Sequence, residues 1–449
     1  MNNGKAAVRT PRLEVRYLSI ACLKLNPRNA RLHSDKQVRQ IARSIEAFGP
    51  IVPVLIDGGS QVIAGHGRVQ AAQLLGLREL PTICVEHLTE AQAKAFAIAD
   101  NKLTENSTWN SNLLGEQLKA LSEVELDFDL EATGFEMAEI DLLIEGLSPA
   151  AESGSDLADE VPDVVEQQVS RPNDLWLLGR HTILCGDSRD ARNHSLLMSG
   201  RKADLVFTDP PYNVRIAGHA TGLGAIQHKN FKMAGGEMSE GEFTDFLARV
   251  FNQLAFHSVD GSLHYVFMDW RHAREILTAG KQAYTELKNV IVWVKNNGGM
   301  GSLYRSQHEL IFLFKNGKEC HRNNVQLGQF GRYRTNVWNY PGVNSFSRST
   351  EEGNLLELHP TVKPVALVAD AIMDCSARGD LVLDSFLGSG TTLIACERTG
   401  RTCYGIELDP LYVDTIVRRW QKFTGLSATH ATSGRGFNEL EKEVADEQR

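Results

Sequence analysis

The sequence predicts an α/β protein with a doubly wound, mostly parallel sheet, preceded by a smaller α+β domain. Three stretches indicate the sheet, at residues 182–188, 204–212 and 381–398, because each begins as an apolar strand that ends in an acidic residue. The last continues through a glycine-rich turn into a helix, and the spacing of the first two leaves room for a helix between them. Alternating strands and helices favour parallel pairing, which brings the residues after each strand to one edge of the sheet.

Composition indicates a protein of two or three domains with sizeable cores, since the chain has 449 residues and 42% apolar content. The net charge of −9 argues against attraction of the whole chain to DNA. Acidic residues are concentrated at 150–170 and after Asn438, however, so one face can still be positive. The seven cysteines form no C-x-x-C pair, and no signal peptide or apolar run of membrane length occurs. We therefore expect reduced thiols and a cytoplasmic protein.

The turn Asp209-Pro210-Pro211-Tyr212 follows the strand 204–208. Its prolines end the strand and stiffen the turn. The Asp209 carboxylate and the Pro210 carbonyl are hydrogen-bond acceptors, and Tyr212 offers a flat face. These groups suit the exocyclic amino group of a flat base.

The glycine-rich turn after the strand 381–384 predicts a ligand site. Gly388 and Gly390 permit positive φ and close approach of a ligand, and the next helix exposes free N–H groups. The turn has only two glycines of the dinucleotide pattern G-x-G-x-x-G. A further strand, 401–406, ends at Glu407, where an acid bonds ribose hydroxyls in doubly wound folds; Asp409 is the alternative.

Together with the strand end at Asp187 and the segment 359–364, these motifs resemble the amino-methylating DNA methyltransferases, which modify adenine N6 or cytosine N4. The order of the motifs matches the permuted β arrangement of that family, over residues 173–427. The resemblance implies S-adenosylmethionine as cofactor. It implies cofactor binding by Asp187, Asp384, Phe386, Gly388, Gly390, Thr391, Glu407, Thr361 and Lys363, with no metal.

The same resemblance implies catalysis by Asp209, Pro210, Pro211 and Tyr212 on a base flipped out of the duplex. Asp209 and the Pro210 carbonyl would accept the amino hydrogens, and Tyr212 would stack on the base. The Asp form in this motif order favours adenine N6, and cytosine N4 stays open. An RNA or protein-amide substrate, or a non-catalytic ParB-like DNA-binding protein, are further alternatives.

Double-stranded DNA is the predicted partner. Basic and aromatic residues interleave at 317–349, as suits phosphate contact and base stacking. The predicted DNA contacts are Arg322, Arg332, Arg334, Lys318 and Tyr333; the alternative is a solvated loop with some core aromatics. A long mobile loop is expected at 213–236. A homodimer is compatible with the sequence, and no partner endonuclease can be inferred.

Residues 12–147 predict a separate N-terminal domain. Its strand, Gly65-His66-Gly67-Arg68 turn and helix resemble the N-terminal domain of ParB-like and sulfiredoxin-like proteins. The ParB turn has Gly-Glu-Arg-Arg, of which only Gly65 and Arg68 remain, and the sulfiredoxin cysteine is absent. A DNA-positioning or assembly module is the favoured interpretation, with an anion site at Gly65, Gly67 and Arg68 as the alternative. Such fusions are typical of prophages.

The expected domain limits follow from these motifs. The N-terminal domain covers 12–147 and ends in helices near 112–121 and 137–147. An acidic flexible linker covers 148–172, the methyltransferase domain 173–427 and a C-terminal tail 428–449.

Overall fold

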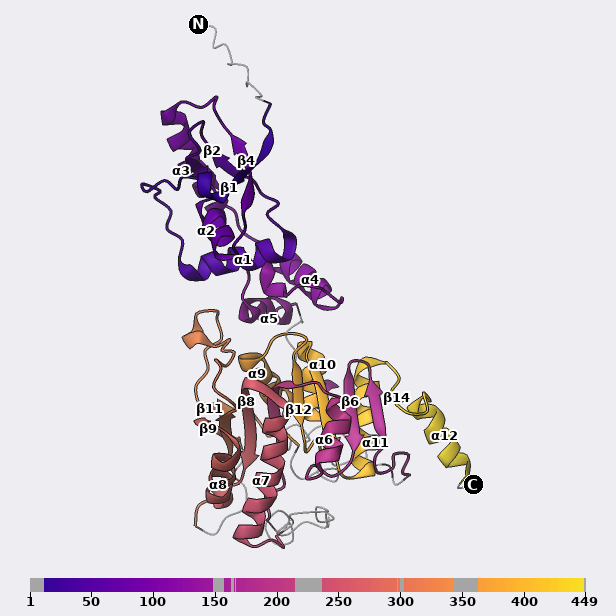
Figure 1. The fold of residues 1–449 in the computed structure, drawn as a ribbon. Helices are drawn as coiled ribbons and strands as arrows, with labels where there is room; N and C mark the ends of the chain where they lie inside the picture. Colours follow the sequence, from indigo (N-terminus) through magenta and orange to yellow (C-terminus); the bar gives the residue numbers. More distant parts are fainter. Residues whose placement is uncertain are drawn as a thin grey trace. The chain divides into compact units, whose positions relative to one another are not determined.

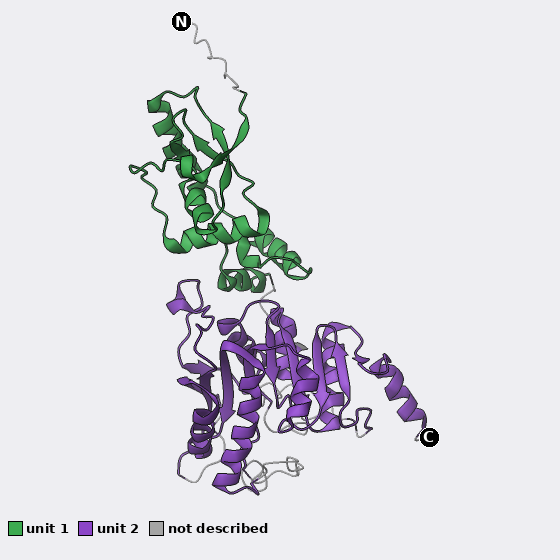
Figure 2. Ribbon diagram, viewed as in Figure 1, with its two compact units in different colours: residues 1–148 green, residues 149–449 purple. Residues whose placement is uncertain are grey.

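The computed structural model describes residues 12–147, 157–162, 165, 167–214, 236–296, 298, 303–342 and 362–447. The chain divides into two compact units, residues 1–148 and 149–449 (Figure 2). Each unit has its own sheet and its own hydrophobic core.

The first unit is built on a four-stranded sheet with the order β1-β4-β2-β3. Its strands are β1 (Val15–Ser19), β2 (Val54–Ile56), β3 (Val62–Ala64) and β4 (Glu79–Cys84). Its helices are α1 (Asp35–Phe48), α2 (His66–Leu74), α3 (Glu90–Glu105), α4 (Ser111–Ser122) and α5 (Met137–Glu145). Only β2 and β4 pair in parallel, which makes this the expected α+β domain.

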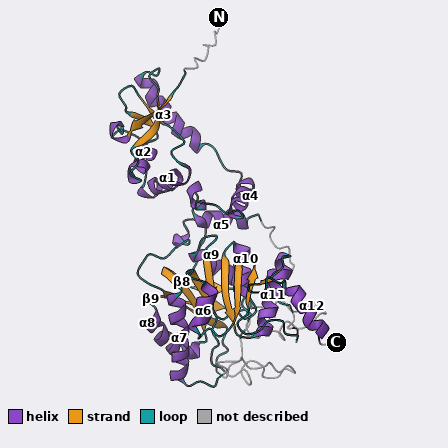
Figure 3. Ribbon diagram, turned by 45° about the vertical axis from the view of Figure 1, so that its right-hand side comes forward, coloured by secondary structure: helices purple, strands orange, loops and turns teal. Residues whose placement is uncertain are grey.

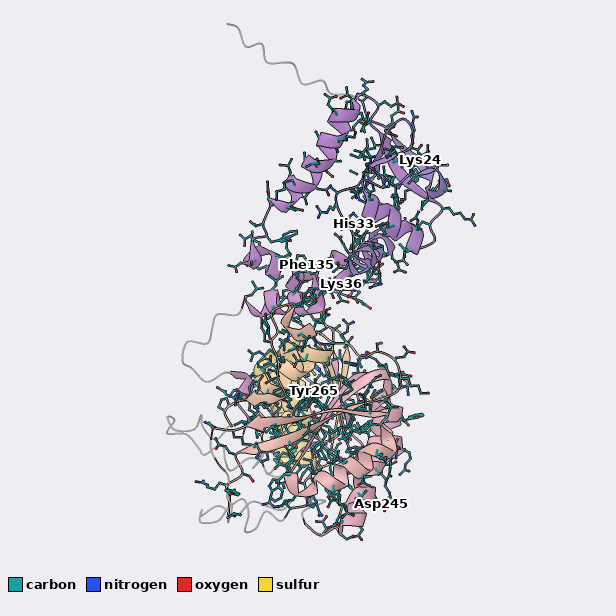
Figure 4. The ribbon with its side chains drawn as sticks, turned by 90° about the vertical axis from the view of Figure 1, so that its left-hand side faces the viewer. Lys24, His33, Lys36, Phe135, Asp245 and Tyr265 are labelled. Atoms are coloured by element: carbon teal, nitrogen blue, oxygen red, sulfur yellow. The ribbon has the colours of Figure 1, made fainter. Side chains whose placement is uncertain are left out.

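Local sequence explains where these helices begin and how they pack. The Ser34 hydroxyl accepts the Gln37 N–H at the start of α1, as capping residues do. Helices α4 and α5 confirm the two helices expected near the end of this unit. They lie close together because Gly115 has no side chain: a Cβ there would lie 2.6 Å from the Leu143 carbonyl oxygen. Lys36 on α1, labelled with Phe135 in Figure 4, pairs with Glu136 at 3.3 Å.

The second unit has a ten-stranded sheet with the order β11-β9-β10-β8-β7-β12-β13-β6-β5-β14. Its strands are β5 (Leu175–Leu178), β6 (His181–Cys185), β7 (Ala203–Thr208), β8 (Ser258–Met268), β9 (Glu286–Val294), β10 (His308–Lys315), β11 (Val337–Asn339), β12 (Leu381–Asp384), β13 (Thr402–Glu407) and β14 (Thr429–His430). The central block β8-β7-β12-β13-β6 is parallel throughout. The predicted fold class is confirmed, with antiparallel strands added on both sides.

Helices cover both faces of this sheet (Figures 1 and 3). They are α6 (Ala191–Met198), α7 (Glu240–Phe256), α8 (Ala273–Ala283), α9 (Val365–Cys375), α10 (Thr391–Thr399), α11 (Pro410–Thr424) and α12 (Phe437–Glu447). One core cluster joins the sheet to α6, α7 and α8, and the other joins it to α9, α10 and α11. The alternation along β7 shows the two faces: Leu205 and Phe207 belong to the second cluster and Val206 to the first. Tyr265 on β8, labelled in Figure 4, reaches Cys375 Sγ on α9 at 3.1 Å.

The chain leaves adjacent strands β7 and β12 in opposite directions. From β7 it passes through α7 to β8, and from β12 through α10 to β13 on the other side. The loops that follow β7 and β12 therefore diverge, which is the arrangement that opens a binding crevice in α/β sheets.

The prediction of a flexible linker is wrong for residues 157–162 and 167–170, because these residues pack on the rest of the second unit. Ala158 is only 2% exposed and its carbonyl accepts Arg419 Nη2 at 2.7 Å. The Asp414 carboxylate on α11 accepts the N–H groups of Val169 and Ser170 at 2.7 and 2.9 Å. The acidic composition of this segment suggested a solvated linker, although Ala158, Val161 and Val169 within it are buried. Residues 148–156 lie outside the described part.

The expected C-terminal tail is also wrong for its described residues. Strand β14 pairs with β5, and α12 begins at the buried Phe437, whose ring lies 5.2 Å from that of Trp176. These residues complete the sheet and core of the second unit.

No helix among the described residues is both long and apolar enough to span a bilayer. Within the same residues, no group of three or more His, Cys, Asp or Glu side chains is arranged to hold a metal ion.

Replacement of Asp414 by Ala tests how residues 167–170 are attached. The change leaves two buried N–H groups without acceptors, so we expect the free energy of unfolding to fall by about 2 to 5 kcal/mol in chemical denaturation. Lys422→Ala is the matched control, because it breaks only the exposed Lys422–Glu160 pair to the same segment. We expect that control to cost less than about 1 kcal/mol. Equal costs for the two variants would contradict the burial described here.

Candidate active site

Four acidic residues meet along one edge of the large sheet. Asp187, Glu407, Asp384 and Asp209 lie at or just beyond the carboxyl ends of the neighbouring strands β6, β13, β12 and β7. Three strand spacings separate the outer two, or roughly 14 Å. The edge is therefore long enough for a nucleoside that bears an extended substituent.

Asp384 joins the two loops that diverge at the centre of this edge. Its carboxylate accepts hydrogen bonds from Thr208 at 2.9 Å, from Thr392 at 2.7 Å and from the Phe386 N–H at 3.0 Å. Burial raises its pKa to about 6. Asp384 therefore supports the glycine-rich turn from the end of β12, and its predicted contact with the cofactor stays a prediction.

The glycine-rich turn lies over the end of β13. The Leu387 N–H donates to the Ile406 carbonyl at 3.0 Å. Gly388 and Gly390 have φ values of 53° and 84°, and a Cβ on Gly390 would lie 2.9 Å from Ile416. Only glycine allows this turn to lead directly into α10 while packing against α11.

Two further residues predicted to bind the cofactor flank this turn. The half-buried Phe386 ring lies 6.1 Å from that of Phe246 on α7. Thr391 is buried at the start of α10, and its hydroxyl accepts Arg419 Nη1 at 3.3 Å.

Glu407 links the end of β13 to the glycine-rich turn. Its two oxygens accept the N–H groups of Gly388 and Asp409, both at 2.8 Å. Burial raises its pKa to about 7. The Asp409 side chain instead caps α11 by accepting the Leu411 N–H at 3.1 Å. Of the two acids considered for the ribose, Glu407 is the one in contact with the turn.

Asp187 follows β6 at the far end of the edge. Arg189 donates to its carboxylate through the backbone N–H and through Nε and Nη2, at 2.6 to 3.0 Å. Partial burial would raise the pKa of Asp187, and the Arg189 hydrogen bonds hold it below the ordinary value.

The catalytic turn carries a buried cluster of charges. The Tyr212 hydroxyl lies 2.7 Å from Asp209 Oδ1 and 3.1 Å from Glu309 Oε2. Lys363 Nζ pairs with Asp209 Oδ2 and lies 3.3 Å from Glu309 Oε2, and Lys295 Nζ pairs with Glu309 Oε1. We call Asp209, Glu309, Lys295 and Lys363 the four-charge cluster.

Burial and charge act in opposite directions within this cluster. Burial raises the pKa of Asp209, and Lys363 offsets only part of that rise. Burial would also raise the pKa of Glu309, but Lys363 and Lys295 together lower it to about 2. Glu309 is therefore a fixed anion, and Asp209 is the group whose charge is sensitive to its partners.

Sequence reasoning missed Glu309 and Lys295. The available signal was an acid near the start of an otherwise apolar strand and a lysine directly after another, at 308–315 and 289–295. Lys363 was expected at the methionine end of the cofactor, and the structure places its ammonium against Asp209. Thr361, predicted beside it, lies outside the described residues.

The rest of the catalytic turn is held firmly. Pro210 is buried and Pro211 is half-buried. Asn213 accepts the N–H groups of Gly236 and Met238 at 3.2 Å and donates to the Met238 carbonyl at 2.8 Å. Its side chain thus joins the two ends of the segment expected as a mobile loop, of which residues 215–235 lie outside the described part.

Two of the predicted DNA contacts are corrected by the structure. Arg332 and Arg334 form ion pairs with Asp370 and Asp374 on α9 at 2.9 to 3.4 Å. The Arg332 side chain is buried, so its guanidinium is committed to α9 and is not presented to phosphate. Sequence pattern could not predict these ion pairs, because Asp370 and Asp374 are 36 to 42 residues away from the arginines.

The other three predicted DNA contacts lie nearer the surface. Lys318 and Tyr333 are exposed, Tyr333 by 82%, and Arg322 is half-buried.

In the first unit, the residues of the turn predicted as an anion site contact other protein groups. Gly65 follows β3 and precedes α2, with a φ of 101°. Arg68 Nη1 donates to the carbonyls of Pro53 and Val52 at 2.5 and 3.2 Å. A Cβ on Gly67 would lie 2.9 Å from Ile41, so this glycine permits α1 and α2 to pack closely. These contacts give the three residues a structural role, and the anion site stays a prediction.

The edge of the large sheet fits S-adenosylmethionine. Backbone N–H groups and carboxylates line its β13 and β6 ends, where a nucleoside offers hydroxyl and amino groups. The buried Ser385 hydroxyl, in the turn between Asp384 and Phe386, has no hydrogen-bond partner among the described residues. A buried hydroxyl left unpaired is costly, which is consistent with a polar ligand at this place.

Comparison with protein families gives three matches along the chain. A DNA methylase model of the N6/N4 type matches residues 203–418, which include the catalytic turn, the glycine-rich turn and Glu407. A ParB N-terminal domain matches residues 4–102, and a ParB-methyltransferase HTH domain matches 112–172. The HTH match covers α4 and α5 and continues through the segment expected as a linker.

Two curated proteins resemble different parts of the chain. The ParB-like nuclease domain-containing protein YnaK of Escherichia coli (strain K12) is 43% identical over 81 residues, which are 18% of this chain and 93% of that protein. The type II methyltransferase M.HpaI of Haemophilus parainfluenzae is 28% identical over 258 residues, which are 55% of this chain and 77% of that protein.

Several solved structures are similar to parts of the chain. An M1.HpyAVI–SAM complex is 24% identical, with a TM-score of 0.37 over 53% of this chain and 98% of that one. The PvuII DNA methyltransferase (cytosine-N4-specific) is 15% identical, with a TM-score of 0.41 over 64% and 97%. Truncated ParB from Caulobacter crescentus, complexed with CTP-gamma-S, is 22% identical, with a TM-score of 0.28 over 31% and 81%.

The family matches and the two curated relatives agree with the two units of the structure. The chain contains an N6/N4 DNA methylase domain, preceded by a ParB-like N-terminal domain and a ParB-methyltransferase HTH domain.

Proposed function

We propose that this protein methylates the exocyclic amino group of a base flipped out of double-stranded DNA, and that the target is adenine N6. The supporting observation is the pairing of β7 with β12, reinforced by the Thr208–Asp384 hydrogen bond. It brings the turn suited to an amino group beside the turn suited to a nucleoside cofactor.

S-adenosylmethionine supplies an activated methyl group on a sulfonium centre. The amino nucleophile needs no covalent enzyme intermediate, so the work of the protein is positioning. Asp209 and the Pro210 carbonyl accept the two amino hydrogens and aim the nitrogen lone pair at the methyl carbon. The Tyr212 ring, whose hydroxyl donates to Asp209 or to Glu309, stacks on the base.

The cofactor roles follow the order of the strand ends. Glu407 would accept hydrogen bonds from the ribose hydroxyls, and Asp187 from the amino group of the cofactor adenine. Phe386 and the N–H groups around Gly388 and Gly390, in the turn after β12, would line the crevice on the side of Glu407 away from Asp187. The β7 end of the edge, with Asp209, would be left for the activated methyl group and the target amino group.

The choice of adenine N6 rests on the Asp form of the catalytic turn. Cytosine N4 has the same local chemistry, a planar amine with two hydrogens, and is the second candidate. Nucleoside digestion and mass spectrometry of DNA methylated by the pure protein separates N6-methyladenine from N4-methylcytosine. RNA and protein substrates assayed beside DNA test the remaining alternatives.

The ParB-like domain is proposed to position the enzyme on DNA. The HTH match at α4 and α5 supports this role, and a homodimer would fit it.

Asp209→Ala tests the proposed chemistry. The variant removes the acceptor for the amino group, and we expect the single-turnover methylation rate to fall by roughly 100-fold or more with cofactor affinity retained. Asp245→Ala is the control for loss of an acid, since Asp245 on α7, labelled in Figure 4, is exposed and is not one of the four acids at the sheet edge. A wild-type rate in Asp209→Ala would refute the mechanism.

Cofactor binding is expected to release a fraction of a proton near pH 7. Ribose hydroxyls that donate to Glu407 favour its charged form and lower its pKa from about 7. Affinity should therefore weaken as pH falls below 7, and the release should vanish near pH 9, where Glu407 is already ionised. Calorimetry in buffers of different ionisation enthalpy measures the release. Its persistence in Glu407→Gln would assign it to another group.

A further inference from the structure

The four-charge cluster draws its members from four separate places in the large sheet. Asp209 follows β7, Glu309 lies on β10, Lys295 follows β9 and Lys363 precedes α9. Lys363 is only 5% exposed, and its ammonium lies 4.9 Å from the centre of the Phe267 ring. A lysine held inside the fold in this way is a built feature of the site rather than a surface charge.

The cluster balances its charge. It contains two carboxylates and two ammonium groups, and an unpaired charge at this depth would be strongly unfavourable. Without Lys363, Asp209 would face Glu309, the Tyr212 hydroxyl and the carboxyl of Asp384, and burial would favour its neutral form. A neutral carboxyl is a poorer acceptor for an amino group.

Glu309 duplicates the hydrogen-bond partners of Asp209. Lys363 Nζ, which has three N–H donors, reaches an oxygen of each carboxylate, and the Tyr212 hydroxyl, which has a single hydrogen, lies within hydrogen-bond distance of either. When an amino group takes a place on Asp209, both partners can stay bound to Glu309. Lys295, on the other oxygen of Glu309, keeps that residue charged and in place.

We propose that Lys363 and Glu309 are positioning residues of the methyl-transfer site: Lys363 keeps Asp209 ionised, and Glu309 retains Lys363 when the target amino group displaces it from one oxygen of Asp209. This inference rests on the proposed function. Neither residue touches the methyl group.

The chemical step balances with these groups in place. The bond from nitrogen to the methyl carbon forms as the bond from that carbon to sulfur breaks, and the bonding pair stays on sulfur. The nitrogen then loses one proton to the ionised Asp209, which passes it to water. Asp209 must be charged at the start for this transfer, which is the condition that Lys363 maintains.

The pH dependence of single-turnover methylation at saturating S-adenosylmethionine tests the proposal. The charged and titratable groups around Asp209 are Lys363, Glu309, Tyr212, Lys295 and Asp384. The acid limb is the part of the pH–rate profile in which the rate falls as Asp209 is protonated. In Lys363→Met this limb should move to higher pH by about one unit or more, because an opposite charge beside Asp209 is lost. In Glu309→Gln it should move to lower pH, because a like charge is lost. Lys363→Arg should keep the wild-type limb.

The opposite shifts distinguish positioning from a merely structural role. A damaged fold would lower the rate of both variants without moving their limbs apart. Limbs that do not move, or that move in the same direction, would overturn the proposal. The control for general loss of a positive charge is Lys422→Met, because Lys422 is an exposed residue on α11. If Lys363→Met fails to fold, the pH–rate profile of Glu309→Gln still tests the proposal. It should lie at lower pH than the profiles of the wild-type protein and of Lys363→Arg.

A titration without turnover separates this inference from the proposed function. Isotope-edited infrared spectroscopy of the aspartate carboxyls, with Asp209→Asn as the reference, follows the protonation of Asp209 directly. A shift of that titration in Lys363→Met, with no methylation of DNA by the wild-type protein, would refute the proposed function and keep the ionisation role of Lys363. An unshifted titration would refute that role whatever the activity.

Discussion

The active site depends on one short contact between neighbouring strands, the hydrogen bond from Thr208 at the end of β7 to Asp384 at the end of β12. The same carboxylate accepts Thr392 at the start of α10, so a single buried side chain joins the catalytic turn, the glycine-rich turn and the helix behind it. The two turns are separated by more than half of this unit in sequence. Their relative position is therefore set by strand pairing and by Asp384, and neither turn could form the site alone.

The acids at this edge of the sheet differ in how their surroundings shift their pKa values. Asp187 and Glu309 are paired with basic residues that hold their pKa values low, so they are permanent anions. Asp384 and Glu407 are buried among neutral donors, and their pKa values are raised to about 6 and 7. Asp209 lies between these cases, because burial and Lys363 oppose each other. The site thus combines fixed charges, which give it shape, with groups that respond to a ligand.

The sequence predicted those parts of the fold and site that depend on local pattern. Apolar strands ending in acids or glycines located β6, β7, β12 and β13, and the two prolines and two glycines marked the turns. The carboxyl-edge rule then predicted that these turns meet. What it could not predict were partners distant in sequence: Glu309 and Lys295 for the catalytic turn, and the α9 acids for Arg332 and Arg334. Composition gave the wrong prediction for residues 157–162, 167–170 and 428–447, because a few buried apolar side chains attach these acid-rich segments to the second unit.

Asn213 has a consequence for how the stacking ring is oriented. Its amide holds Gly236 and Met238, just before α7, beside the residue that follows Tyr212. The backbone after the ring is therefore fixed to α7 as well as to β7. Loss of this amide would leave every catalytic group intact, and would affect the reaction only through the angle that the ring presents to the base.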